Sequence, residues 1–210
     1  MSRGFAIRPK TFQQLNAEAF PQSVGQPECF AHYWYDTQTY LDNATTQLTF
    51  FAATQADRSL SNLPTAGQLE DPQFFEIHCI MLDAVADAGF VTTAAGGVAG
   101  AIDDLGLLMV TGRPRVTLNI SDKQYGPWPA TLMHASGGPV GFGWGTFTAE
   151  ESLQYGNNGP PDGGLFIGGS IIIPPKVGFR LTMDWPAAVN LTDDYRLKMT
   201  LGGVLHRAVR

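Results

Sequence analysis

Charged residues are scarce in this chain. Of its 210 residues, 13 are Lys or Arg and 19 are Asp or Glu, so only 15% carry a charge. A soluble domain typically contains about 25% charged residues. The deficit suggests that part of the surface is covered by something other than water, such as a partner subunit. The formal net charge of −6 argues against the basic field that non-specific nucleic-acid binding needs, so we expect no specific nucleic acid as a partner.

Cysteines and long apolar runs are also rare. The two cysteines, Cys29 and Cys79, match no zinc-binding spacing, and Cys79 lies in an apolar run typical of a buried thiol rather than a disulfide. No window approaches the ~18 uninterrupted apolar residues of a membrane-spanning helix. The first residues, Met1 to Phe5, lack the apolar stretch of a secretion signal, so we expect synthesis in a reducing cytoplasm.

Motifs for catalysis and metal binding are missing. The four histidines are scattered along the chain: His32, His78, His134 and His206. A metal-binding jelly roll of the cupin type has two histidines one residue apart with a glutamate soon after, and nothing here has that spacing. Ser136 and Ser170 lack the Gly-x-Ser-x-Gly setting of a nucleophile elbow. We therefore predict no catalytic residue, no metal ligand and no cofactor, and we expect that the protein is not an enzyme.

Acidic pairs and a glycine tract give no stronger signal. The adjacent carboxylates form three pairs: Asp103-Asp104, Glu150-Glu151 and Asp193-Asp194. Sequence neighbours point apart on a strand or a helix, so all three pairs are interpreted as solvated surface. The tract Gly96–Gly100 lacks the lysine of a phosphate-binding loop and is interpreted as a flexible linker.

Turn-forming and aromatic residues are abundant. The chain has 24 Gly and 14 Pro together with 13 Phe, 6 Tyr and 4 Trp, a composition typical of strands joined by turns. Strands and helices do not alternate, so a parallel doubly wound sheet is not expected. The predicted fold class is all-β: an antiparallel β-sandwich or single jelly roll of about eight strands with two short helices and an N-terminal arm.

The predicted arm covers residues 1–45, and residues 46–210 are predicted to form one jelly-roll domain. Within the arm, Thr11 and Gln14 have capping-box spacing, which predicts a helix from Phe12 to about Phe20. The aromatic tract Phe30–Tyr35 is expected to plug one end of the core or to dock on a neighbour. The β body is expected to begin near Gln47.

The first half of the domain contains three predicted strands and one helix. Gln47–Thr54 is predicted as a buried strand, and Phe74–Leu82 as a strand whose odd positions, Phe75 to Met81, share one face. A helix is predicted from Val98 to Met109, ended by Gly112. A half-buried strand follows, with Val116, Leu118 and Ile120 on its apolar face.

Weaker signals fill the middle of the chain. Residues 122–129 are interpreted as a connection, and Thr131–His134 as a short strand. Phe142–Thr148 is a weak strand, and Glu150–Gly164 is a long exposed loop because Gly, Asn and Pro crowd its end.

The last third has the clearest pattern. Leu165–Ile173 predicts an apolar strand. In the next two strands apolar residues occupy every second position: Val177, Phe179, Leu181, Met183 and Trp185, then Tyr195, Leu197, Met199 and Leu201. Basic residues gather between Lys176 and Arg210. We interpret them as ordinary strand-face charge, with a small basic surface as the alternative.

Three stretches carry a resemblance to a known family. They are Gly67–Leu82, Ile102–Leu132 and Gly168–Val209, which together cover about half the chain. In the order of their strands, helix and connections they resemble the jelly-roll capsid proteins of tailless icosahedral viruses, particularly bacteriophages. These are patterns of spacing and polarity, and the family has no invariant catalytic residue to transfer.

The resemblance implies a structural virion protein: a capsid shell subunit made in the host cytoplasm that self-associates into capsomers and contacts other capsid proteins. Some of these viruses have an internal membrane beneath the shell. The alternative is a carbohydrate- or receptor-binding β-sandwich module of a virion fibre or vertex. Four aromatic residues are candidates for stacking on sugars, although strand-end tryptophans more often belong to the core: Trp128, Trp144, Tyr155 and Trp185.

Overall fold

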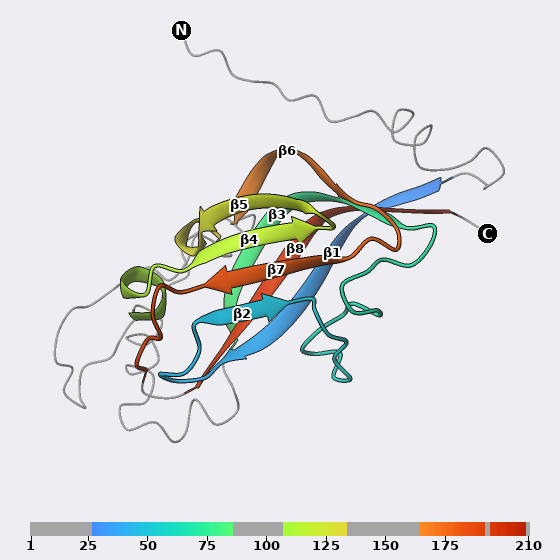
Figure 1. Ribbon diagram of the computed structural model, residues 1–210. Coiled ribbons are helices and arrows are strands. Elements are labelled where there is room, and N and C mark those ends of the chain that lie inside the picture. The colour runs from blue at the N-terminus through green and yellow to red at the C-terminus, as the bar shows by residue number, and fades with distance from the viewer. Residues whose placement is uncertain (1–26, 86–106, 134–163, 192–193, 209–210) are drawn as a thin grey trace, which may run out of the picture.

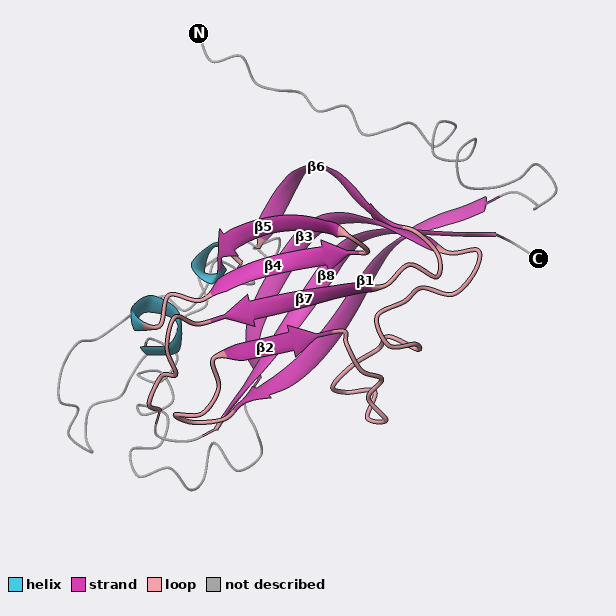
Figure 2. Cartoon of the chain, viewed as in Figure 1, coloured by secondary structure: helices cyan, strands magenta, loops and turns pink. Residues whose placement is uncertain are grey.

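Strands account for most of the structure, a computed structural model that describes residues 27–85, 107–133, 164–191 and 194–208 (Figure 1 and Figure 2). In these ranges the strands are β1 (Pro27–Tyr40), β2 (Gln47–Phe50), β3 (Phe74–Val85), β4 (Arg115–Ile120), β5 (Lys123–Pro129), β6 (Leu165–Ile173), β7 (Phe179–Asp184) and β8 (Tyr195–Ala208). Two short helical turns accompany them, η1 (Leu107–Thr111) and η2 (Ala130–Leu132). The predicted all-β class is therefore confirmed.

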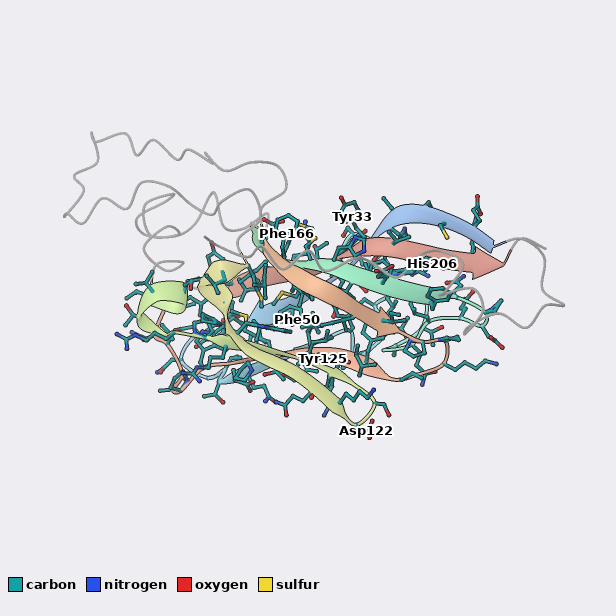
Figure 3. All side chains as sticks on the ribbon, turned by 90° about the horizontal axis from the view of Figure 1, so that it is seen from above. Tyr33, Phe50, Asp122, Tyr125, Phe166 and His206 are labelled. Atoms are coloured by element: carbon teal, nitrogen blue, oxygen red, sulfur yellow. The ribbon has the colours of Figure 1, made fainter. Side chains whose placement is uncertain are left out.

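The described strands form two antiparallel sheets of four strands each. The first sheet has the order β1-β8-β3-β6, and the second sheet has the order β2-β7-β4-β5. Strand β1 pairs with β8, β2 with β7, β3 with β6 and β4 with β5. In addition, β3 pairs with β8 in the first sheet and β4 pairs with β7 in the second. Seen from above in Figure 3, the sheets lie as two layers, and the buried Phe50 lies between them. This arrangement is consistent with the predicted sandwich.

The core forms where the two layers face each other. The strands of the last third bury every second side chain, as their pattern predicts: Phe179, Leu181 and Met183 on β7, and Tyr195, Leu197, Met199 and Leu201 on β8. Strand β4 contributes Val116, Leu118 and Ile120 in the same way. Burying one large apolar side chain contributes roughly 1.5–3 kcal/mol, so this alternation is the main stabilising pattern of the sandwich.

Part of the predicted arm is instead a long strand of the first sheet. Strand β1 pairs with β8 over its whole length, from Pro27 opposite Ala208 to Tyr40 opposite Tyr195. The expected start of the β body near Gln47 is therefore wrong, and the aromatic tract lies within β1, with Trp34 buried in the core. Residues 1–26, including the predicted helix from Phe12 to Phe20, lie outside the described residues.

A buried carboxylate interrupts the alternation of apolar and polar residues in β1, so the sequence pattern does not indicate a strand there. Asp36 is fully buried, although a charged residue inside a strand normally marks the solvent side. The Phe51 N–H donates to Asp36 Oδ2 at 2.7 Å, the Gln38 amide donates to Oδ2 at 2.9 Å, and the Gln55 amide donates to Oδ1 at 2.5 Å. These donors satisfy the carboxylate and fix the loop after β2 to β1.

The outer edge of β1 is covered at its centre by Asn62. The Tyr35 N–H donates to Asn62 Oδ1 at 2.8 Å, and the Asn62 side-chain amide donates to the Tyr33 carbonyl at 2.7 Å. The Asn62 N–H also donates to the Tyr35 carbonyl at 3.3 Å. One asparagine therefore occupies the hydrogen-bonding groups that a further strand would use.

Strand β3 changes face halfway along. Its register against both neighbours shifts between Ile77 and Cys79, which marks a β-bulge at the intervening residue. Phe75 and Ile77 are buried before the bulge, whereas Ile80 and Leu82 are buried after it. The prediction that all odd positions from Phe75 to Met81 share one face is therefore wrong beyond the bulge, where Cys79 and Met81 are half-buried.

Several shorter predictions also change. The connection predicted over residues 122–129 is strand β5, which forms a hairpin with β4, and the strand predicted at Thr131–His134 is the helical turn η2 within its described part. Only the end of the predicted Val98–Met109 helix is described, and there η1 is a π-helical turn. The Gly112 N–H closes this turn by donating to the Leu107 carbonyl at 2.8 Å. Phe142–Thr148 and residues 150–163 lie outside the described residues.

Candidate functional site

A thiol, two imidazoles and a carboxylate meet on the outer face of the first sheet. Cys29 Sγ lies 2.9 Å from His206 Nδ1, and His206 Nε2 lies 3.7 Å from Glu76 Oε2. The second Glu76 oxygen lies 3.4 Å from His78 Nε2. The Phe74 ring stacks on His206 with centroids 4.2 Å apart, and both Glu76 and His206 are buried.

The order of these groups resembles that of a thiol nucleophile, its general base and an orienting carboxylate. The pKa shifts of the thiol and of the imidazole, however, are not those of such a catalytic site. Burial and the nearby Glu76 raise the pKa of the Cys29 thiol, which favours the neutral thiol over the reactive thiolate. Burial also lowers the pKa of His206, although Glu76 opposes this shift. The 3.7 Å separation from Glu76 exceeds a hydrogen bond. The pKa shifts of Cys29 and His206 therefore do not favour a thiolate–imidazolium pair, and the cluster has the properties of packing between strands.

No local sequence motif predicts this cluster. Cys29 and His206 are 177 positions apart, and they meet only because β1 pairs with β8 in a register that places them opposite each other. Among the other histidines, His32 lies edge-on to Trp34, and burial lowers its pKa. His134 lies outside the described residues.

An aromatic row crosses the outer face of the first sheet. Tyr33 lies opposite Gly202, Gly202 opposite Cys79, and Cys79 opposite Phe166, so the row spans all four strands. Tyr33 and Phe166 expose 55% and 63% of their surface, and Figure 3 shows both on the side away from Phe50. A Cβ at Gly202 would lie 3.0 Å from the Tyr33 ring and 2.6 Å from the Cys79 sulfur, so the glycine makes room for both neighbours.

The second sheet carries a different feature, an open cavity of about 410 Å³ at one end. Four small residues leave the space: Ala52, Ala66, Gly67 and Gly178. Four polar residues line it: Gln68, Asn119, Ser121 and Arg180. Gly67 has a φ of +55°, and a Cβ there would lie 2.8 Å from the Phe179 carbonyl oxygen, so only glycine fits this wall.

The polar side chains of the cavity have no partner within the described part of the chain. No hydrogen bond or ion pair there involves the side chain of Gln68, Asn119, Ser121 or Arg180. Asn119 and Arg180 lie opposite each other on β4 and β7. The neighbouring backbone is already paired, because the Ser121 N–H donates to the Gly178 carbonyl and the Phe179 N–H to the Gly67 carbonyl. The cavity therefore presents side-chain donors and acceptors.

The basic residues of the last third do not form one patch. Lys176 pairs with Asp71 at 2.7 Å, and Arg207 pairs with Glu28 at 2.8 Å. Lys198 lies on the first sheet, 3.8 Å from Asp83, whereas Arg180 lies on the second sheet. Arg180, Lys198 and Arg207 lie on strands, as the strand-face interpretation predicts, whereas Lys176 lies in the turn before β7.

Other candidate residues have structural places or lie outside the described residues. Trp185 is buried, stacks edge-on with Tyr40 and donates to the Leu108 carbonyl, while Trp128 packs half-buried against the core. Asp194 accepts from the Asp42 N–H at 2.9 Å. Several others lie outside the described residues: Asp103, Asp104, Ser136, Trp144, Glu150, Glu151, Tyr155, Asp193 and Gly96–Gly100. Both cysteines are free, and Cys79, predicted to be a buried thiol, is half-buried.

Searches for known sites and known relatives are negative. In the described ranges no three His, Cys, Asp or Glu residues are grouped so that they could hold a metal ion. No helix in those ranges is long and apolar enough to span a membrane. Comparison with models of protein families, with curated proteins and with solved structures finds no match.

Proposed function

We propose that this chain is a structural virion protein, a capsid shell subunit built on a single jelly roll. The strand pairing carries the proposal. When an antiparallel ribbon rolls up into two sheets, the first strand pairs with the last, the second with the second to last, and so on inward. The pairs β1–β8, β2–β7, β3–β6 and β4–β5 follow this rule, which supports a jelly roll, a fold of viral capsid and lectin domains and of cupins.

The fold alone does not choose among these functions, but the surface favours a shell subunit. Interface cores are enriched in aromatic residues and depleted in charge. The aromatic row ends in two exposed aromatic side chains, Tyr33 and Phe166, on either side of the buried Gly202 and the half-buried Cys79, and the chain as a whole has few charges. In this proposal the row contacts a second copy of the chain within a capsomer, and other capsid proteins complete the shell. An internal membrane beneath the shell is a further expectation from the family resemblance.

The proposal is tested by the assembly state of the full chain. Analytical ultracentrifugation and electron microscopy of the purified protein should detect a multimer or closed particles. The double substitution Tyr33→Ser and Phe166→Ser should weaken association at least tenfold, because each removes an exposed aromatic contact of roughly 1–2 kcal/mol. Leu41→Ser is the matched control, since Leu41 is also an exposed apolar residue, at 50%, but lies outside the row.

A protein that stays monomeric at high concentration would overturn the shell role. Equal loss of association in the double variant and in Leu41→Ser would overturn the assignment of the aromatic row. Each variant should unfold at a melting temperature close to that of the original protein, because exposed side chains contribute little to the core. Thermal unfolding checks this.

A further inference from the structure

We propose that the cavity on the second sheet binds a sugar that carries one carboxylate, such as a uronic or sialic acid. This goes beyond the shell role, because it assigns a ligand to a surface that the aromatic row does not use. The cavity lies between the turn after β4, the start of β7 and two loops of the second sheet. Its volume of about 410 Å³ falls within the range of small-molecule sites, roughly 300–1,000 Å³.

Arg180 supplies the charge recognition. Its guanidinium is exposed at the cavity wall and has no carboxylate partner within the described residues. A guanidinium presents paired N–H groups that match the two oxygens of a carboxylate. The nearby Lys176 is already paired with Asp71, so Arg180 is the lining residue that offers a positive charge.

Uncharged donors and acceptors supply the recognition of hydroxyl groups. The amides of Gln68 and Asn119 and the hydroxyl of Ser121 line the same cavity and are unpaired within the described chain. Each amide offers two N–H donors and one carbonyl acceptor, and the hydroxyl both donates and accepts. Sugar hydroxyls require this mixture, because they also donate and accept.

The same geometry disfavours a phosphate group. Phosphate sites typically use several backbone N–H groups or more than one cation. Here the Ser121 and Phe179 N–H groups already donate to carbonyls, at 2.8 and 2.7 Å. The net charge of −6 also opposes a dianion more than a monoanion.

Gly178 offers a direct way to fill the cavity. A Cβ at this lining glycine would meet no atom within 4 Å, and its φ lies outside the left-handed region. A larger side chain there can therefore project into open space without strain. Gly178→Phe should fill the cavity while the sandwich stays folded.

The test measures binding to the full chain by isothermal titration calorimetry and saturation-transfer NMR. The probes are N-acetylneuraminic acid, glucuronic acid, glucose, acetate and inorganic phosphate. We expect one or both acidic sugars to bind, with glucose and acetate at least about tenfold weaker. Arg180→Gln should weaken the acidic sugar at least about tenfold, since a charged hydrogen bond is lost. Gly178→Phe should abolish binding.

Arg115→Gln is the matched control. Arg115 is exposed on β4, outside the cavity, and has no ion-pair partner in the described ranges. It should leave affinity for the acidic sugar unchanged. Absence of binding by both acidic sugars, tighter binding of phosphate, or equal losses in Arg180→Gln and Arg115→Gln would each overturn the proposal. Arg180→Gln tests it even if Gly178→Phe fails to fold.

Discussion

The outer faces of the two sheets carry different chemistry. On the first sheet the exposed Tyr33 and Phe166 lie in one row, beside the buried Glu76 and His206 and the exposed Cys29 thiol. On the second sheet the half-buried Thr49 and Thr182 and the buried Thr117 lie side by side across three strands, and the face ends at the polar cavity. Both faces come from the same two-residue alternation, so the choice of outward residues distinguishes a surface suited to protein contact from one suited to water and polar ligands.

The largest expected effect comes from Gly203 on the first sheet, with Gly178, just before β7, for comparison. A Cβ at Gly203 on β8 would lie only 1.9 Å from the Glu76 carbonyl oxygen on β3, whereas one at Gly178 would meet nothing. Gly203→Ala should therefore force β8 and β3 apart and lower the free energy of unfolding by about 3 kcal/mol or more. Gly178→Ala should change it by less than about 0.5 kcal/mol.

Urea denaturation of the two glycine variants measures this difference. Similar stability of the two variants would contradict the close packing of β3 against β8, because both glycine positions would then tolerate a Cβ equally well.

A smaller effect is expected at Asp36, the buried carboxylate that fixes a loop of the second sheet to β1. Asp36→Ala leaves the Phe51 N–H without its acceptor, so the free energy of unfolding should fall by about 2 kcal/mol. Asp184→Ala is the control on the polar face. Asp184 accepts one hydrogen bond, from the exposed Gln47 side chain on the edge strand β2, so its replacement should cost less than about 1 kcal/mol. Chemical denaturation distinguishes the two, and an equal loss would remove the special role of Asp36.

The smallest effect is a pH dependence that belongs to the first sheet. Burial lowers the pKa of His206 and of His32 below the ordinary value, so the folded state binds these protons less readily than the unfolded state. The free energy of unfolding should therefore be at its full value above about pH 6.5 and should fall as the pH drops below it.

Melting temperatures between pH 5 and pH 7.5 test this dependence. His206→Gln should flatten the profile, and the double variant with His32→Gln should flatten it further. An unchanged slope in the double variant would show that neither imidazole is held neutral by the fold.

The sequence predicts the fold best where alternation is uninterrupted. Strands β7 and β8 were predicted from every second apolar residue, and these positions form the core. Prediction failed where a tertiary interaction overrides the local pattern. The bulge in β3 changes the buried positions from odd, as at Ile77, to even, as at Ile80. The buried Asp36 interrupts the apolar pattern of β1, which was therefore assigned to an arm.

The candidate sites could not be predicted because neither has a local motif. Cys29 meets His206 only through strand register. The cavity combines Gln68, Asn119 and Arg180 from separate parts of the chain, and its space depends on the absence of side chains at glycines. The low charge predicts a covered surface, which stays a prediction, and composition carries no information on which face is aromatic.

Asn62 has a consequence for how copies of this chain can join. By filling the hydrogen-bonding positions at Tyr33 and Tyr35, it prevents a strand of another molecule from docking along the middle of β1. A β-sheet that continues from one molecule to the next therefore cannot start there, which protects this long edge strand against fibre formation. Any contact that another copy makes along the middle of β1 must therefore use side chains, and contacts of that kind are more easily reversed than a continuous sheet.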